Sequence, residues 1–418
     1  MPDRAVTPDD VAATAVRLRS VVRRTALEGS YRLSAAARCE VWLKREDAQL
    51  CRSYKVRGAY ALIASLSEEE RSRGVICASA GNHGQGLAFA CAQLGIPGRV
   101  FVPTNTPRQK RDRIRAIGGD RVELVVAGGS YDAASAAAQD AARDAGSLYV
   151  HPFDDARTIA GQGTVAVEIL EQHPGPLDTV VVPIGGGGLV AGMALWLRER
   201  SPGTRIVGVE PAGAASMRAA LDAGRPVTLD AVDGFVDGAA VARAGELPLP
   251  IVRDLVDEVV TVEEGAVCTE MLELYQTEGI IAEPAGALAS AALRTGRLSR
   301  PPTGPTVCVV SGGNNDVSRY GEIVERSLLH EQLRHYFLVT FPQEPGALRH
   351  FLDGVLAGGE DIVLFEYVKK NNRETGPALV GIDLERAEDL PALLARMDAS
   401  PIETERVPPG SPLFSFLL

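Results

Sequence analysis

The segment TVVVPIGGGGLVAGMALWL, residues 179–197, decides between two very different folds. It carries no charge and is long enough to cross a membrane as a helix. However, it contains one proline and five glycines, which are unfavourable inside a continuous helix. A buried strand, a glycine turn and a buried helix explain the segment better, and this succession is typical of a parallel α/β sheet.

The same alternation of β-branched runs and helical patterns extends from about residue 40 to 325. Continuous apolar strands joined by helices predict an α/β fold in which both faces of each parallel sheet are covered. Ligands bind beyond the C-terminal ends of such strands. The predicted strands are 75–79, 99–103, 121–127, 179–184, 205–210, 258–262 and 306–311, and predicted helices include 83–95, 130–146 and 264–279.

A different pattern begins after about residue 330 and predicts a second domain, with 1–330 as the first. The order βαββαβ in this tail is that of a ferredoxin-like unit. Its predicted strands are 335–342, 362–371, 378–385 and 402–407, with helices at 346–356 and 390–400 and a turn at 371–377.

Composition excludes several classes of function. The net charge is −11, and the basic run RQKRDRIR at 108–115 includes an aspartate, so we expect a solvated helix face and no nucleic-acid partner. The six cysteines form no CxxC pair, which favours buried free thiols in a reducing cytoplasm over a disulfide framework or metal cluster. The first residues lack the apolar core of a signal peptide, and no membrane association is expected.

The stretch CRSYKVRGAY, residues 51–60, places Lys55 between Arg52 and Arg57. A desolvated amine beside other cations loses part of its preference for protonation, as a Schiff-base nucleophile requires. The alternative interpretation is a helix start with a solvated basic face.

Three further motifs each follow a predicted strand. SAGNHGQG (79–86) and GGGGL (185–189) open helices whose free N–H groups can bind an anion. SGGN (311–314) places Ser311 at the C-terminal rim of the sheet. Each motif alone also fits a purely structural turn, and Glu283 in IIAEPAGA could simply be an acid at a helix start.

In this order, together with IAGQGT (159–164) and EPAGA (283–287), the motifs resemble those of the fold-type II pyridoxal-phosphate (PLP) enzymes, the tryptophan synthase β-like fold. The resemblance is strongest to the short form of biosynthetic threonine dehydratase, or threonine ammonia-lyase, with one C-terminal ACT-like domain. It implies a smaller subdomain at about 50–155 and a regulatory domain at 331–418.

The resemblance assigns roles to the residues that match. Lys55 would bond covalently to the aldehyde of PLP, and Lys55 and Ser79 are the catalytic candidates. Asn82 would bind the phenolic oxygen of the cofactor, and Ser311 would face its pyridine nitrogen. The phosphate loop would be Gly185, Gly186, Gly187, Gly188 and Leu189, and the loop for the substrate carboxylate would be Ser79, Gly81, Asn82 and His83.

The implied reaction is deamination of L-threonine to 2-oxobutanoate and ammonia, the first step of isoleucine biosynthesis, with L-serine as a further substrate. L-isoleucine would inhibit through the tail of a cytoplasmic homotetramer. A serine/threonine deaminase of catabolism, a serine racemase-like enzyme and an amino-acid sensor remain alternatives. Ala80 stands where the racemases carry a second serine. The racemase-like relatives bind a divalent ion at the position of Glu210 and use a second acidic residue nearby. That second position is Ser216 in this sequence, so we assign no metal.

Overall fold

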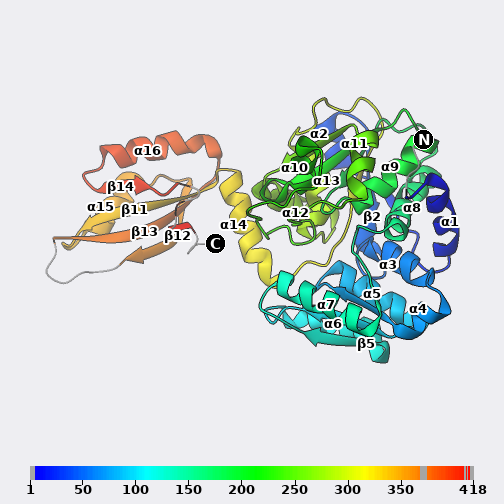
Figure 1. Cartoon of the computed structure of the whole chain (residues 1–418). Helices are drawn as coiled ribbons and strands as arrows, with labels where there is room; N and C mark the ends of the chain where they lie inside the picture. Colours follow the sequence, from blue (N-terminus) through cyan, green and yellow to red (C-terminus); the bar gives the residue numbers. More distant parts are fainter. Residues whose placement is uncertain (1–4, 368–373, 409–410, 412, 415–418) are drawn as a thin grey trace. The chain divides into compact units, whose positions relative to one another are not determined.

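The computed structural model describes residues 5–367, 374–408, 411 and 413–414. The chain divides into two compact units, one ending at Asn315 and the other beginning at Asp316. Figure 1 shows the first unit in blue to yellow and the strands of the second in orange and red.

The larger sheet of the first unit confirms the predicted parallel architecture. It has six strands in the order β1-β2-β10-β7-β8-β9, and only β1 runs antiparallel to its neighbour. Sequence patterns missed β1 and β2, which are short or end in charged residues. The strands are β1 (Leu27–Gly29), β2 (Val41–Arg45), β7 (Thr179–Pro183), β8 (Arg205–Pro211), β9 (Glu258–Val262) and β10 (Thr306–Val310).

The segment 179–197 forms strand, turn and helix, as its glycines and proline indicate. Strand β7 ends at Pro183, and helix α9 (Gly188–Arg200) begins after Gly187, whose φ is 94°. The side chains of Val180 and Val182 pack with α9 and α8 (Ala156–Gln172), and α13 (Pro284–Arg294) contacts the sheet strands as well. No helix among the described residues is long and apolar enough to span a membrane.

A second, smaller parallel sheet has the order β5-β4-β3-β6. Its apolar residues pack with helices α3, α5 and α6 in one cluster and with α7 in another, so both faces are covered. The sequence did not indicate β6. The elements are β3 (Val75–Ala78), β4 (Gly98–Val102), β5 (Val122–Val126), β6 (Leu148–Tyr149), α3 (Lys55–Ala64), α5 (Asn82–Leu94), α6 (Arg108–Gly118) and α7 (Tyr131–Ala145).

Glycines bring α8 unusually close to two other helices. A Cβ built on Gly161 would lie 2.6 Å from Gly58 Cα in α3, and one built on Gly192 in α9 would lie 2.2 Å from Ile159 O. Atoms this close overlap, so only glycine permits these contacts. The motif IAGQGT therefore serves to pack α8 against both α3, which begins with Lys55, and α9.

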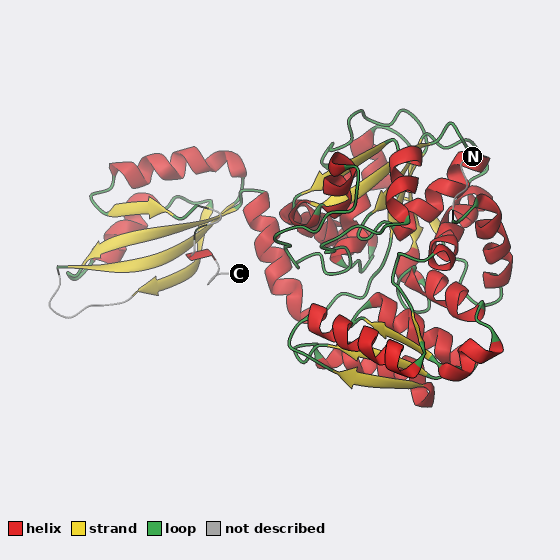
Figure 2. Ribbon diagram, in the orientation of Figure 1, coloured by secondary structure: helices red, strands yellow, loops and turns green. Residues whose placement is uncertain are grey.

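The C-terminal unit has the predicted ferredoxin-like topology. Four antiparallel strands in the order β12-β13-β11-β14 carry α15 and α16 on one face (Figure 2). The predicted turn begins in residues outside the described part, and its last residues already belong to β13. The elements are β11 (Arg334–Pro342), α15 (Ala347–Val355), β12 (Glu360–Tyr367), β13 (Thr375–Leu384), α16 (Leu390–Ala399) and β14 (Glu403–Arg406).

The remaining helices lie around these sheets. Five of the six cysteines are buried, Cys39 is partly exposed, and all are free thiols. The helices are α1 (Pro8–Leu18), α2 (Tyr31–Ala37), α4 (Glu68–Arg73), α10 (Ser216–Ala223), α11 (Pro248–Leu255), α12 (Glu264–Glu278) and α14 (Tyr320–His330).

The helix contact at Gly192 gives a stability test. We expect Gly192→Ala to lower the free energy of unfolding by roughly 1–3 kcal/mol, because the new methyl group must displace the α8 backbone. Urea denaturation followed by tryptophan fluorescence measures this in the first unit, which holds both tryptophans, Trp42 and Trp196. Gly203→Ala is the control, since nothing lies within 4 Å of its Cβ. Equal stability of the two variants would contradict the packing argument.

Candidate active site

Lys55 is the first residue of α3, and its amine lies in a largely desolvated position. Nζ donates a hydrogen bond to Pro152 O at 3.0 Å. Burial lowers the pKa of Lys55 to about 8, although the nearby charge of Glu283 acts to raise it. Near neutral pH a much larger share of this amine is therefore uncharged than in an ordinary lysine.

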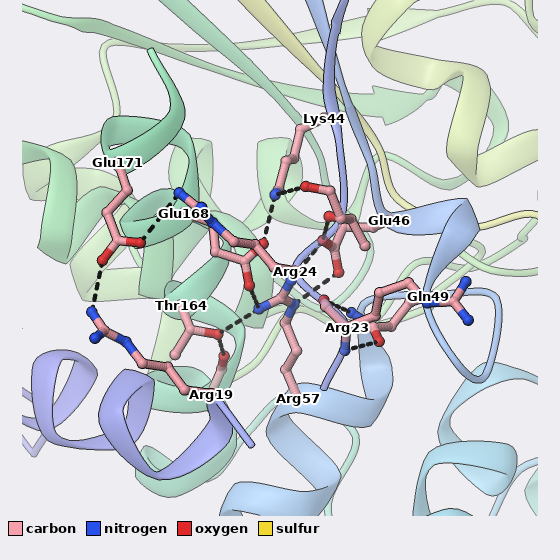
Figure 3. Close-up of polar contacts among 12 residues, drawn as sticks. Arg19, Arg23, Arg24, Lys44, Glu46, Gln49, Arg57, Thr164, Glu168 and Glu171 are labelled. Atoms are coloured by element: carbon pink, nitrogen blue, oxygen red, sulfur yellow. Dashed lines mark hydrogen bonds and ion pairs between the residues drawn. The ribbon is translucent and has the colours of Figure 1, made fainter. Parts of the chain in front are cut away.

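The prediction that neighbouring arginines lower the pKa of Lys55 is wrong. The guanidinium of Arg57 is held by two carboxylates: its Nε and Nη2 donate to the two oxygens of Glu46, both at 2.8 Å, and Nη1 donates to Glu168 at 2.7 Å. Figure 3 shows the guanidinium lying between these carboxylates. The depressed pKa of Lys55 comes from burial, and no arginine contributes to it.

The turn SGGN holds the chain just before Lys55. Tyr54 N donates to Ser311 O at 3.1 Å, and Gly313 N donates to Arg52 O at 2.9 Å. Ser53 forms an isolated antiparallel bridge with Gly312. Arg52 has a φ of 53°, which non-glycine residues adopt rarely and which often marks a functional site. The Ser311 hydroxyl is buried and donates to Ala285 O at 3.2 Å.

The glycine turn lies beside the same site, because β7 and β10 are parallel neighbours that end together. A Cβ on Gly186 would lie 2.3 Å from the ring of Phe153, the residue after the carbonyl that Lys55 binds. A Cβ on Gly187 would lie 2.4 Å from Met217 Cε. These glycines are thus required for packing. No side chain of the described chain caps α9 at this turn, so its N–H groups can bind an anion.

The motif SAGNHG forms the corresponding turn between β3 and α5. The Ser79 hydroxyl accepts a hydrogen bond from Gly81 N at 3.2 Å, and nothing lies within 4 Å of a Cβ built on Gly81. The His83 ring is buried, and its Nε2 bonds to Val150 O at 2.8 Å. Burial lowers the pKa of His83 to about 3, so the ring is neutral. For a carboxylate, His83 can offer its backbone N–H but not this ring nitrogen.

Asn82 contacts two residues to which sequence motifs gave no role in the site. Its Nδ2 donates to Glu283 Oε1 at 2.6 Å, and its Oδ1 accepts from Asn314 Nδ2 at 2.6 Å. Glu283 stands at the start of α13, as expected of a helix-start acid, but its side chain does not cap that helix. Burial raises the pKa of Glu283 to about 7.

Glu210 has a structural partner rather than ligands for a cation. Its carboxylate accepts hydrogen bonds from Met217 N at 2.7 Å and Arg218 N at 2.8 Å, in the first turn of α10. Burial raises the pKa of Glu210 to about 7. Among the described residues, no group of three or more His, Cys, Asp or Glu is arranged to hold a metal ion.

These groups suit PLP. The site combines a desolvated lysine amine, an uncapped helix start after a glycine turn and a buried serine beside the lysine segment. The amine can bond to an aldehyde, and the N–H groups can bind a phosphate dianion.

Comparison with known proteins agrees with this chemistry. Residues 18–312 match the family model described as pyridoxal-phosphate dependent enzyme, and residues 325–417 match the C-terminal regulatory domain of threonine dehydratase. The chain is therefore a fold-type II PLP-dependent enzyme with a C-terminal regulatory domain.

Relatives that match nearly the whole chain identify its family within this class of enzymes. The chain is 59% identical over 412 residues to the biosynthetic L-threonine dehydratase of Mycobacterium tuberculosis, covering 98% of this chain and 95% of that one. It is 46% identical over 401 residues to that of Bacillus subtilis, covering 96% and 95%. The chain belongs to the family of biosynthetic L-threonine dehydratases.

Two solved structures share the fold of this protein over about three quarters of the chain. Processed threonine deaminase isoform 2 from Solanum lycopersicum has a TM-score of 0.73 and 36% identity, covering 77% of this chain and 93% of that one. Maize serine racemase has a TM-score of 0.72 and 32% identity, covering 78% and 99%.

The burial of Lys55 predicts the pH range in which its amine becomes reactive. In cofactor-free protein, we expect acetylation of Lys55, measured by peptide mass spectrometry, to rise with a midpoint near pH 8, whereas an ordinary lysine titrates near about 10.4. Because the charge of Glu283 raises the pKa of Lys55, Glu283→Gln should shift this midpoint downward. An unshifted wild-type midpoint would show that the amine is solvated.

Proposed function

We propose that this protein deaminates L-threonine to 2-oxobutanoate and ammonia, with PLP held through Lys55. The observation that carries the proposal is the buried Lys55 amine, whose pKa is lowered to about 8 and which binds Pro152 O, next to the Phe153 ring on which Gly186 packs. The family of biosynthetic L-threonine dehydratases supplies the substrate class.

We assign the cofactor contacts as follows. Lys55 would bond to the aldehyde, and the N–H groups of Gly185, Gly186, Gly187, Gly188 and Leu189 would bind the phosphate. Asn82 would donate to the phenolic oxygen, and Ser311 would face the pyridine nitrogen. Bound PLP supplies a sink for the electrons that remain at the substrate α-carbon after its proton is removed.

The chain's own groups carry the proton transfers and the positioning. Lys55, with its amine free, would take the α-proton of the substrate as general base. Its lowered pKa leaves a much larger share of the amine unprotonated near neutral pH than an ordinary lysine has. The N–H groups at the start of α5, with Ser79 and Gly81, hold the substrate carboxylate. Loss of the β-hydroxyl as water, followed by hydrolysis of the enamine, yields 2-oxobutanoate and ammonia.

Two features of the chain favour elimination over racemisation. Racemisation needs a proton donor on the second face of the α-carbon, and Ala80 has no exchangeable proton. The Ser311 hydroxyl already donates to Ala285 O and is too weak an acid to protonate a pyridine nitrogen. The electron sink is therefore moderate, which favours prompt loss of the β-hydroxyl.

We propose in addition that the first unit is catalytic, that the ferredoxin-like unit binds L-isoleucine, and that the enzyme is a cytoplasmic homotetramer. The match of residues 325–417 to the regulatory domain of threonine dehydratase supports an effector site in the ferredoxin-like unit. Couplings between sites are typically about 1–3 kcal/mol, or roughly 5- to 150-fold in affinity.

Replacement of the lysine tests the catalytic proposal. We expect Lys55→Ala to lose the visible absorption of bound PLP and to reduce 2-oxobutanoate formation from L-threonine by about a thousandfold or more, because it removes both anchor and base. Arg143→Ala, at a 71% exposed side chain, serves as the control with unchanged rate. Retention of both absorbance and activity in Lys55→Ala would refute this assignment.

The effector proposal is tested on the full-length enzyme. L-Isoleucine should lower the rate at subsaturating L-threonine severalfold, and a saturating substrate concentration should relieve the inhibition. Turnover of L-serine measured in parallel separates a threonine dehydratase from a serine-preferring deaminase. A rate that does not respond to L-isoleucine, with L-serine the better substrate, would favour the catabolic alternative.

A further inference from the structure

A closed ring of hydrogen bonds surrounds the side chain of Asn82. Glu283 accepts on both oxygens, from Asn82 Nδ2 at 2.6 Å and from Asn314 N at 3.2 Å. The amide of Asn314 donates to Asn82 Oδ1 at 2.6 Å and to Cys51 O at 2.8 Å. Asn314 is thus fixed by the segment that leads to Lys55, and it closes the ring with Glu283.

This ring favours one orientation of the Asn82 amide. A carboxylate accepts hydrogen bonds, and the Asn314 amide nitrogen only donates them. A flipped Asn82 would place its oxygen against Glu283 and its nitrogen against the donor of Asn314. In the observed orientation, Asn82 Nδ2 donates one N–H to Glu283, and its second N–H remains for a ligand.

The position of Glu283 has no simpler structural explanation. It is only 4% exposed, and its carboxylate does not cap α13. Burial of a carboxylate is unfavourable unless it is well hydrogen-bonded. Gly312 leaves room for the Glu283 carboxylate, because a Cβ on Gly312 would lie 2.2 Å from Glu283 Oε1. The SGGN turn therefore leaves room for this carboxylate against Asn82.

We propose that Glu283 and Asn314 are positioning residues that hold the Asn82 amide in the orientation in which its free N–H binds the ring oxygen of PLP. The inference rests on the proposed function, in which Asn82 contacts the cofactor. Glu283 and Asn314 act through Asn82 and need not touch the cofactor or the substrate.

The isosteric change Glu283→Gln removes this control. A glutamine amide has an acceptor oxygen and a donor nitrogen, so its two terminal atoms cannot both accept, one from Asn82 and the other from Asn314. Hydrogen bonds to charged groups are strong enough that we expect PLP to bind roughly tenfold more weakly. Asn314→Ala removes the other anchor and should also weaken binding, which keeps the test valid if one variant folds poorly.

The measurement is a double-mutant cycle on PLP affinity. Cofactor-free wild type, Asn82→Ala, Glu283→Gln and the double variant are titrated with PLP and followed by absorbance. If Glu283 acts through Asn82, the double variant should bind PLP no more weakly than Asn82→Ala alone. Glu69→Gln, at a 77% exposed side chain, is the matched control with unchanged affinity. Urea unfolding of the same cofactor-free proteins detects a purely structural effect.

The possible outcomes separate the inference from the function on which it rests. If Asn82→Ala binds PLP as wild type does, the assigned role of Asn82 fails and the inference fails with it. If Asn82→Ala weakens binding but Glu283→Gln and Asn314→Ala do not, only the inference is overturned. Additive losses in the double variant, matched by equal losses of stability, would likewise reduce Glu283 to a structural residue.

Discussion

The buried ion pairs of Arg57 hold the first unit together around the start of α3, the helix that begins with Lys55. Its guanidinium is 1% exposed and Glu46 is 0% exposed. It joins three elements: α3, the 3-10 turn Glu46–Ala48 after β2 through Glu46, and α8 through Glu168. Burial alone would raise the pKa of Glu46, but Arg57, together with Lys44 and Thr25, outweighs it and leaves the pKa lowered. Loss of one partner of such a pair typically costs about 3–5 kcal/mol.

Two cations of the same helical turn therefore have opposite environments. Arg57 is neutralised by two carboxylates and is purely structural, whereas Lys55 has a backbone carbonyl as its hydrogen-bond acceptor in a desolvated position. Because the ion pairs of Arg57 and the glycine contacts with α8 fix the first turn of α3, the lysine amine is held in place without a salt bridge of its own. Such an amine can serve as both nucleophile and base.

Much of this could be predicted from the sequence, and the failures have physical causes. Strand 258–262 and the strand–turn–helix of 179–197 follow from local apolar patterns and glycines, which act over a few residues. Strand β2 was missed because Lys44 and Arg45 interrupt its apolar run; Lys44 is nevertheless buried, with Nζ 2.6 Å from Glu168. The contacts of Asn82 with Glu283 and Asn314 span 201 and 232 residues, so no local pattern reveals them. The roles of Arg57 and of the His83 ring depend in the same way on distant partners.

The central claim is that one particular amine, that of Lys55, bonds to the cofactor. Borohydride reduction of the PLP-loaded enzyme fixes such a bond permanently, and peptide mass spectrometry then locates it. The account predicts a pyridoxyl adduct on Lys55, in about one copy per chain, with the other lysines unmodified. An adduct on Lys44 or Lys110 in its place, or cofactor recovered entirely as free pyridoxine phosphate with no adduct on the chain, would contradict it.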